Sequence, residues 1–87
     1  MMNISNHTLD SFVGFYFGDI KIPIIAVYEN PADFPGKYVA RLFDLQQITN
    51  YIIVKDTLAE IRECIPSAFN KMPRSQEDDP TILEIWM

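Results

Sequence analysis

The chain has 87 residues with 48% hydrophobic and 13% aromatic residues, which excludes a disordered polypeptide and predicts one hydrophobic core in a single domain, 1–87. Twelve acidic and seven basic residues give a formal net charge of −5. The basic residues are spread along the chain, so no basic face for a phosphate backbone is evident. We expect residues 1–10, a polar segment without a signal-peptide pattern, to form a loosely ordered tail.

The first expected strand covers residues 20–28, where apolar residues alternate and continue through Ile24 and Tyr28. Pro23 cannot donate a ladder hydrogen bond, so either this strand lies at a sheet edge or its pairing begins after Pro23. Residues 12–17 are rich in aromatic side chains and precede the turn formers Gly18 and Asp19. They predict a less regular strand that pairs with the first one as a hairpin.

Residues 29–36 contain Asn, Asp, Gly and two Pro residues, which predicts a loop. Residues 37–44 alternate again, with Arg41 on the side opposite Leu42, and predict a strand. We expect a polar connection over 45–50 and a further strand over 51–55, where β-branched residues predominate.

Thr57 and Glu60 form a capping box, so we predict a helix that begins at Thr57 and ends or turns near Pro66. Residues 72–80 predict a loop, and 81–86 predict a last strand. The resulting class is α+β, a mainly antiparallel sheet of four or five strands in the order (β)-β-β-β-α-β with one helix on one face. We expect a single core made of Ile24, Val39, Leu42, Ile52, Val54, Leu58, Ile61, Ile82 and Ile85.

Candidate catalytic and metal-binding residues are few. Cys64, the only cysteine, falls in the second half of the predicted helix beside Glu63, where the helix dipole opposes a thiolate, so we expect it to be a chemically inert core residue. His7 is the only histidine and has only Asp10 as a nearby acid. No zinc or calcium spacing and no phosphate-binding glycine motif is present, so the sequence predicts no catalytic residue, no metal and no cofactor.

One charged segment is a candidate for partner binding. Glu77, Asp78 and Asp79 follow Arg74 between two prolines, in a stretch without apolar residues. Such a run is usually a solvated connector, and its alternative role is to dock a basic protein by electrostatic attraction.

The segment 38–65, two strands followed by D-T-L-A-E-I at a helix start, resembles the core of HicB-type antitoxin domains. This resemblance implies a small acidic domain that neutralises a basic RNA-cleaving partner. No DNA-binding tail of the kind found in HicB proteins follows. The ending P-R-S-Q-E-D-D-P-T-I-L-E-I-W is also similar to that of small uncharacterised bacterial proteins, which implies no particular function.

Taken together, these patterns favour a non-catalytic protein-binding or regulatory module of bacterial or phage type. A single cysteine rules out an internal disulfide, and a chain without disulfides fits the reducing cytoplasm, so we expect a cytoplasmic protein. One alternative is a small enzyme or enzyme subunit whose site is completed at an oligomer interface. The other is a nucleic-acid-binding domain, for which aromatic residues of the sheet would stack bases beside gathered basic residues. We also expect a homodimer, because one short helix leaves part of a sheet face uncovered.

Overall fold

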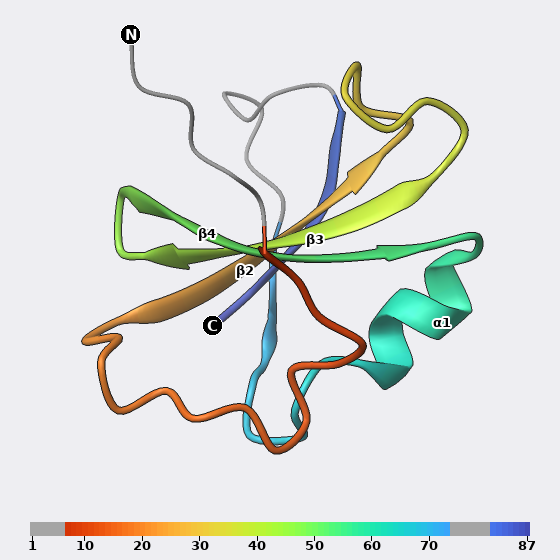
Figure 1. Cartoon of the computed structure of the whole chain (residues 1–87). Helices are drawn as coiled ribbons and strands as arrows, with labels where there is room; N and C mark the ends of the chain where they lie inside the picture. The colour runs from red at the N-terminus through yellow and green to blue at the C-terminus, as the bar shows by residue number, and fades with distance from the viewer. Residues whose placement is uncertain (1–6, 74–80) are drawn as a thin grey trace, which may run out of the picture.

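The computed structural model describes residues 7–73 and 81–87 and contains one twisted sheet with one short helix (Figure 1). The elements in chain order are β1 (His7–Thr8), β2 (Pro23–Glu29), β3 (Tyr38–Asp44), β4 (Gln47–Lys55), α1 (Leu58–Glu63), β5 (Lys71–Met72) and β6 (Ile82–Trp86). None of the helices among these residues is long and apolar enough to cross a membrane.

The sheet has six strands in the order β1-β4-β3-β2-β6-β5. All neighbours are antiparallel except β1, which runs parallel to β4. The α+β class is therefore confirmed, but the sheet is larger than predicted and mixed. The two additional strands, β1 and β5, lie at the two edges and have two residues each, which is too short to produce an alternating pattern.

Pro23 is the first residue of β2, a central strand rather than an edge strand. It pairs with Asp44 of β3, whereas pairing with β6 begins at Ile25 opposite Trp86. Pro23, which has no N–H to donate, therefore lies before the point where pairing with β6 begins. Of the two alternatives for this proline, the structure shows that pairing begins after it.

The predicted connection over 45–50 is wrong, because β4 already begins at Gln47. The register between β3 and β4 shifts around Leu42, and the Thr49 hydroxyl donates a 2.6 Å hydrogen bond to the Leu42 carbonyl. The same hydroxyl accepts a hydrogen bond from the Tyr51 N–H. The Thr49 side chain thus takes the place of a backbone hydrogen bond at the register shift between β3 and β4. Because of this, β4 includes polar residues that were predicted to form a connection.

Residues 12–17 do not form the predicted strand. Gly14 has a positive φ of 82°, and the Phe15 N–H bonds to the Phe12 carbonyl in a tight turn. A second turn joins Phe17 to Ile20. These turns abolish the alternation of a strand, so Phe12, Phe15 and Phe17 all pack toward the same core, with ring centroids 5.7 Å apart for Phe12 and Phe15 and 4.8 Å apart for Phe15 and Phe17.

The N-cap half of the predicted capping box is confirmed at the start of α1. Thr57 Oγ1 accepts a 3.2 Å hydrogen bond from the Glu60 N–H and lies 2.9 Å from the Glu60 carboxylate. The helix ends at Glu63, and the chain then turns at Pro66, whose carbonyl accepts from the Phe69 N–H. Pro66 therefore begins a turn after the helix has ended.

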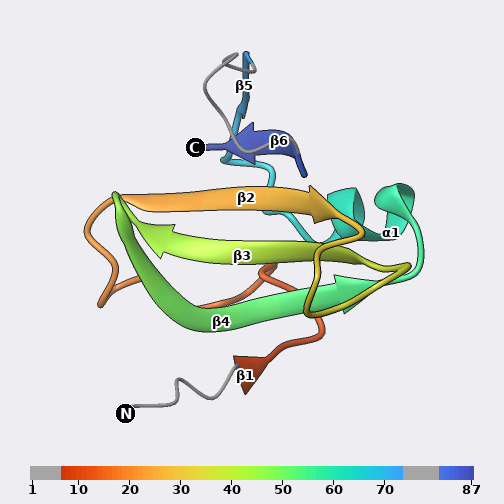
Figure 2. The ribbon, with the colours of Figure 1, turned by 90° about the horizontal axis from the view of Figure 1, so that it is seen from above.

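The sheet has two different faces. We call the side that carries Ile25, Val27, Ala40 and Leu42 the helix face, since it packs with Phe12 and Ile61 in one buried cluster. The opposite side, the outer face, carries Ile24, Ala26, Val39, Phe43, Ile52 and Ile85, as the strand register shows. Figure 2 looks onto the outer face, with α1 behind the strands and the loop between β2 and β3 in front.

The expectation of one shared core is therefore wrong. Of the predicted core residues, Leu42 lies on the helix face with Ile61, whereas Val39 and Ile52 are buried on the outer face. Alternation assigns residues to opposite sides of each strand, but it leaves open how the sides of neighbouring strands correspond.

Candidate functional site

The segment predicted to dock a partner lies outside the described residues. This applies to all four candidates, Arg74, Glu77, Asp78 and Asp79. Their role in binding a basic protein stays a prediction.

The other two candidates for chemistry lie in different parts of the fold. Cys64 caps the end of α1, is 7% exposed, and its Sγ lies 3.3 Å from the Asp10 carbonyl oxygen. His7 lies on the edge strand β1, where its ring is 5.6 Å from that of Tyr51. Over residues 7–73 and 81–87, no three His, Cys, Asp or Glu side chains gather in a way that could hold a metal ion.

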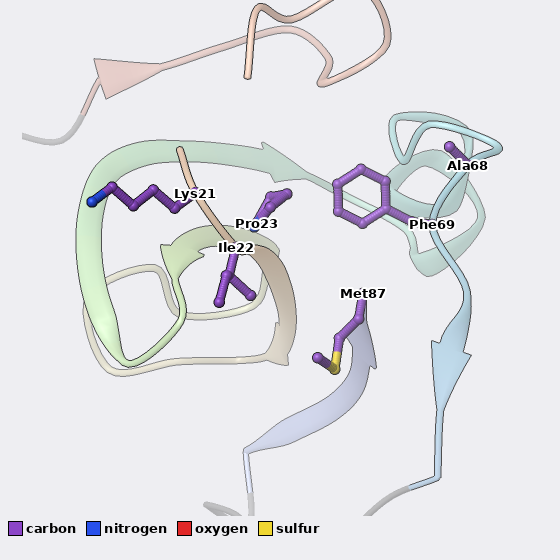
Figure 3. Close-up of a pocket in the computed structure, with 6 residues that line it drawn as sticks. All are labelled: Lys21, Ile22, Pro23, Ala68, Phe69 and Met87. Atoms are coloured by element: carbon purple, nitrogen blue, oxygen red, sulfur yellow. The ribbon is translucent and has the colours of Figure 1, made fainter. Parts of the chain in front are cut away.

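One apolar hollow of about 440 Å³ lies at one end of the sheet, and we call it the Phe69 hollow (Figure 3). Its lining residues come from three separate segments of the chain and are Lys21, Ile22, Pro23, Ala68, Phe69 and Met87. In Figure 3 the Phe69 ring and the Met87 side chain stand on one side, and Ile22 and Pro23 stand on the other. The ammonium group of Lys21 points away from Phe69.

Backbone hydrogen bonds hold the walls of this hollow in place. The N–H of Met87 donates to the Asn70 carbonyl at 2.9 Å, and the N–H of Asn70 donates to the Met87 carbonyl at 2.8 Å. On the opposite wall, the Ile22 N–H donates to an Asp44 carboxylate oxygen at 3.0 Å. The Phe69 ring packs on Phe17, with centroids 5.5 Å apart.

The hollow combines fixed walls with exposed apolar side chains. Ile22 is 43% exposed and Met87 is 46% exposed, both high values for large hydrophobic residues. A volume of this size is typical of sites that accept a small apolar group or the side chains of a partner. Chemically, the hollow can bury hydrocarbon, and it offers little with which to activate a bond.

The most strongly built polar cluster lies elsewhere, at the helix face. The buried Glu84 carboxylate accepts from Arg62 Nε at 3.0 Å and from Trp86 Nε1 at 3.1 Å, and it lies 3.6 Å from Lys71 Nζ. Burial raises the pKa of Glu84, but the hydrogen bonds from Arg62 and Trp86 and the charges of Arg62 and Lys71 outweigh burial and hold this pKa below its ordinary value. The cluster ties α1 and β5 to β6.

Three of the remaining titratable groups also have shifted pKa values because of neighbours. The hydrogen bond that the Tyr38 hydroxyl donates to the Glu29 carboxylate, together with the negative charge of Glu29, raises the pKa of Tyr38. The hydrogen bond and charge of Lys37 lower the pKa of Asp56, and those of Glu84 raise the pKa of Arg62. None of these groups lines the Phe69 hollow.

Four of the basic side chains within the described ranges are bound to carboxylates. Lys37 pairs with Asp56, Arg41 pairs with Asp33, and Glu84 takes both Arg62 and Lys71. These pairs lie on different elements, and in each of them a carboxylate compensates the positive charge.

Sequence reasoning missed every residue of the Phe69 hollow. Its walls come from the start of β2, the turn after α1 and the end of β6, which no local motif connects. The exposed Ile22 beside Pro23 is a weak signal, because it belongs to the alternating segment 20–28 but lies where pairing with β6 is absent. Comparisons of the chain with protein-family models, with curated proteins and with solved structures give no match.

Proposed function

We propose that this protein is a non-catalytic protein-binding module, and that the Phe69 hollow receives an apolar side chain of its partner. The observation that carries this proposal is a hydrocarbon-lined recess of about 440 Å³ with two exposed large hydrophobic residues on its walls. Exposed apolar surface of this kind is typical of sites that bind another polypeptide.

The lining supports binding rather than catalysis. Lys21 has the single ionisable side chain of the lining, and its ammonium group points away from Phe69 (Figure 3). An enzyme needs a nucleophile, a base or a charge-stabilising group beside the reacting atoms. For the enzyme alternative, such groups would have to come from another chain.

Net charge supports a basic partner. The chain carries a formal net charge of −5, and the acidic run Glu77, Asp78 and Asp79 adds a local concentration of negative charge. Opposite charges accelerate encounter, while buried apolar contacts slow dissociation. A HicB-like role, in which the partner is a basic RNA-cleaving protein of the cytoplasm, is one form of this function.

Affinity capture from the native cell, followed by mass spectrometry, identifies the partner. We then expect Met87→Asn to weaken binding of that partner about tenfold, because a polar amide replaces a side chain that contributes about 1.5 kcal/mol when buried. Val13→Asn is the matched control, since Val13 is 59% exposed and does not line the hollow. Equal affinity of wild type and Met87→Asn would contradict the assignment of the hollow as the binding site.

The charge contribution needs a separate kinetic measurement. The triple variant Glu77→Gln, Asp78→Asn, Asp79→Asn should associate with the captured partner roughly tenfold more slowly at low salt and dissociate at nearly the same rate. The difference should shrink at high ionic strength. Identical association rates at low salt would return the acidic run to the role of a solvated connector.

A further inference from the structure

One side of the Phe69 hollow is formed by a segment that lies between two basic residues. Phe69 lines the hollow, Arg62 of α1 precedes it in the chain, and Lys71 of β5 follows it. Both basic side chains bind the carboxylate of Glu84: Arg62 Nε donates to it at 3.0 Å, and Lys71 Nζ lies 3.6 Å from it. A single carboxylate of β6 therefore holds both ends of the wall segment, which runs from Arg62 to Lys71.

The same carboxylate is linked to Met87, which stands beside Phe69 on this side of the hollow (Figure 3). The indole of Trp86 donates to Glu84 at 3.1 Å, and Trp86 pairs with the lysine of β5 in the ladder between β5 and β6. Met87, the next residue, exchanges two backbone hydrogen bonds with Asn70, at 2.8 and 2.9 Å. Because β5 has only two residues, the side-chain contacts of Glu84 add a second set of links to a short ladder.

Glu84 is an unusual residue for its place in the sheet. Its side chain is buried on the helix face, where it pairs with the apolar Val27, whereas Arg62 and Lys71 are half exposed. A buried ion pair often stabilises a protein no more than apolar residues of the same volume do. A buried carboxylate with several hydrogen bonds instead gives the groups that it holds a defined geometry.

We propose that Glu84 is a positioning residue for the Phe69 hollow. By binding two basic side chains and the indole together, its carboxylate holds Phe69 and Met87 in place and fixes one side of the recess. Glu84 does not line the hollow, so it acts through the backbone and not by contact with a bound side chain. The consequence for binding rests on the proposed function: a preformed hollow receives an apolar side chain at a lower entropic cost than a mobile one does.

Amide hydrogen exchange of the full chain, measured by NMR at neutral pH, tests this role without a ligand. In Glu84→Gln the side chain keeps its size and loses the charge that binds the two basic residues. The Leu45 amide, which bonds to the Ile22 carbonyl at 2.8 Å, is the reference, because Ile22 lies on the opposite side of the hollow (Figure 3). The Asn70 and Met87 amides should lose at least about tenfold more protection than this reference, whereas a role in global stability alone would lower protection on both sides alike.

Two further variants keep the exchange measurement decisive if Glu84→Gln does not fold. Lys71→Gln removes one cation from the exposed end of the cluster and should lower the protection of the same two amides about threefold. Lys37→Gln removes the exposed ion pair with Asp56, which lies elsewhere in the molecule, and should leave their protection unchanged.

Trp86 gives an independent signature, because it is the single tryptophan of the chain and its indole N–H donates to Glu84. Its fluorescence emission should change as wild type is acidified below the ordinary pKa of a glutamate, since protonation weakens this hydrogen bond. The emission of Glu84→Gln should stay constant over the pH range in which both proteins are folded. A step of the same size in both proteins would assign the change to another group.

Equal loss of protection on both sides of the hollow, or no loss at Asn70 and Met87, would overturn the positioning role. The partner captured from the native cell then separates this inference from the proposed function. If Met87→Asn weakens its binding, Glu84→Gln should weaken it about fivefold without contacting the bound side chain, and an unchanged affinity would overturn the inference alone. If Met87→Asn leaves binding unchanged, the proposed function fails, while the exchange measurement still decides whether Glu84 positions this wall.

Discussion

The two faces of this sheet bury their apolar side chains in different ways. The helix face is covered by α1 and by the aromatic turns of residues 12–20, and the ion pairs of Glu84 close its margin. Among residues 7–73 and 81–87, the loop between β2 and β3 covers one end of the outer face (Figure 2), and the apolar hollow beside Ile24 and Phe43 lies along this face. We infer that the free energy of folding depends mainly on the helix face, while partner binding depends on the Phe69 hollow at the end of the sheet.

Truncation of one isoleucine on each face is the strongest test of this difference. Ile61 is the fully buried residue of α1, so Ile61→Ala should lower the free energy of unfolding by about 2–4 kcal/mol. Ile48 is half exposed on the outer face, so Ile48→Ala should lower the free energy of unfolding of the monomer by no more than about 0.5 kcal/mol. Urea unfolding at low protein concentration measures both values. Similar losses for the two variants would remove the proposed division between the faces.

Glu84→Gln tests the polar closure of the helix face. The change weakens hydrogen bonds from Arg62 and Trp86 and removes the charge that holds Lys71, so we expect a loss of about 1.5–3 kcal/mol. The loss should stay below that of a fully buried ion pair, because the Arg62 side chain is 49% exposed and can return to water. The matched variant Glu63→Gln, on an exposed helix position, should unfold like wild type.

The same carboxylate predicts how stability changes in acid. The pKa of Glu84 is lower in the folded protein than in the unfolded chain, where it is about 4.3, so its contribution is complete above that value and is lost as pH falls through the folded pKa. The urea midpoints of wild type and Glu84→Gln should therefore converge as pH is lowered below about 4. A constant gap between the two midpoints would show that the charge of Glu84 is irrelevant to folding.

Cys64 gives a smaller test of how tightly the helix face is closed. Its thiol is 7% exposed and packs beside the Asp10 carbonyl, so a thiol reagent at neutral pH should modify it at least about tenfold more slowly than in urea-unfolded protein, equivalent to about 1.4 kcal/mol of protection. Cys64→Ala should leave partner binding within a few-fold of wild type. Rapid labelling of the folded chain would instead revive a reactive role for this cysteine.

Part of this architecture could be predicted from local sequence. Thr57 and Glu60 mark the helix start because the capping hydrogen bonds form within one turn. Alternation located β3 closely. In contrast, Gly14 turned an apparent strand into a turn, since a single positive φ outweighs the β-propensity of its aromatic neighbours.

The Phe69 hollow could not be predicted, because it depends on contacts between distant segments. Met87 reaches the Phe69 hollow only because its backbone pairs with Asn70. Ile48 belongs to β4 only because Thr49 takes the place of a backbone hydrogen bond and allows β4 to begin early. Irregularities of pairing and the choice of face are properties of the assembled sheet, and periodicity within one strand does not contain them.

The smallest effect concerns the turn between β3 and β4. Leu45→Gly should stabilise the monomer relative to Leu45→Ala by about 1 kcal/mol, because both variants lose the side chain while Gly alone adopts a φ of 57° without cost. Asn30 is the other non-glycine residue with a positive φ among the described residues. Asparagine adopts this conformation more readily than leucine does, and the Asn30 side chain accepts a hydrogen bond from the Gly36 N–H.

The positive φ of Leu45 comes from the turn itself, because Leu45 and Gln46 alone connect β3 to β4 and turns of this length commonly place a residue at positive φ. Leu45→Gly and Leu45→Ala remove the same exposed side chain, so urea unfolding of the two variants isolates the backbone cost. Both variants keep the N–H at this position that donates to the Ile22 carbonyl, so partner binding should stay like that of wild type. Equal stability of the two variants would show that Leu45 carries no backbone strain, and weaker partner binding by either would extend the binding site from the Phe69 hollow to this turn.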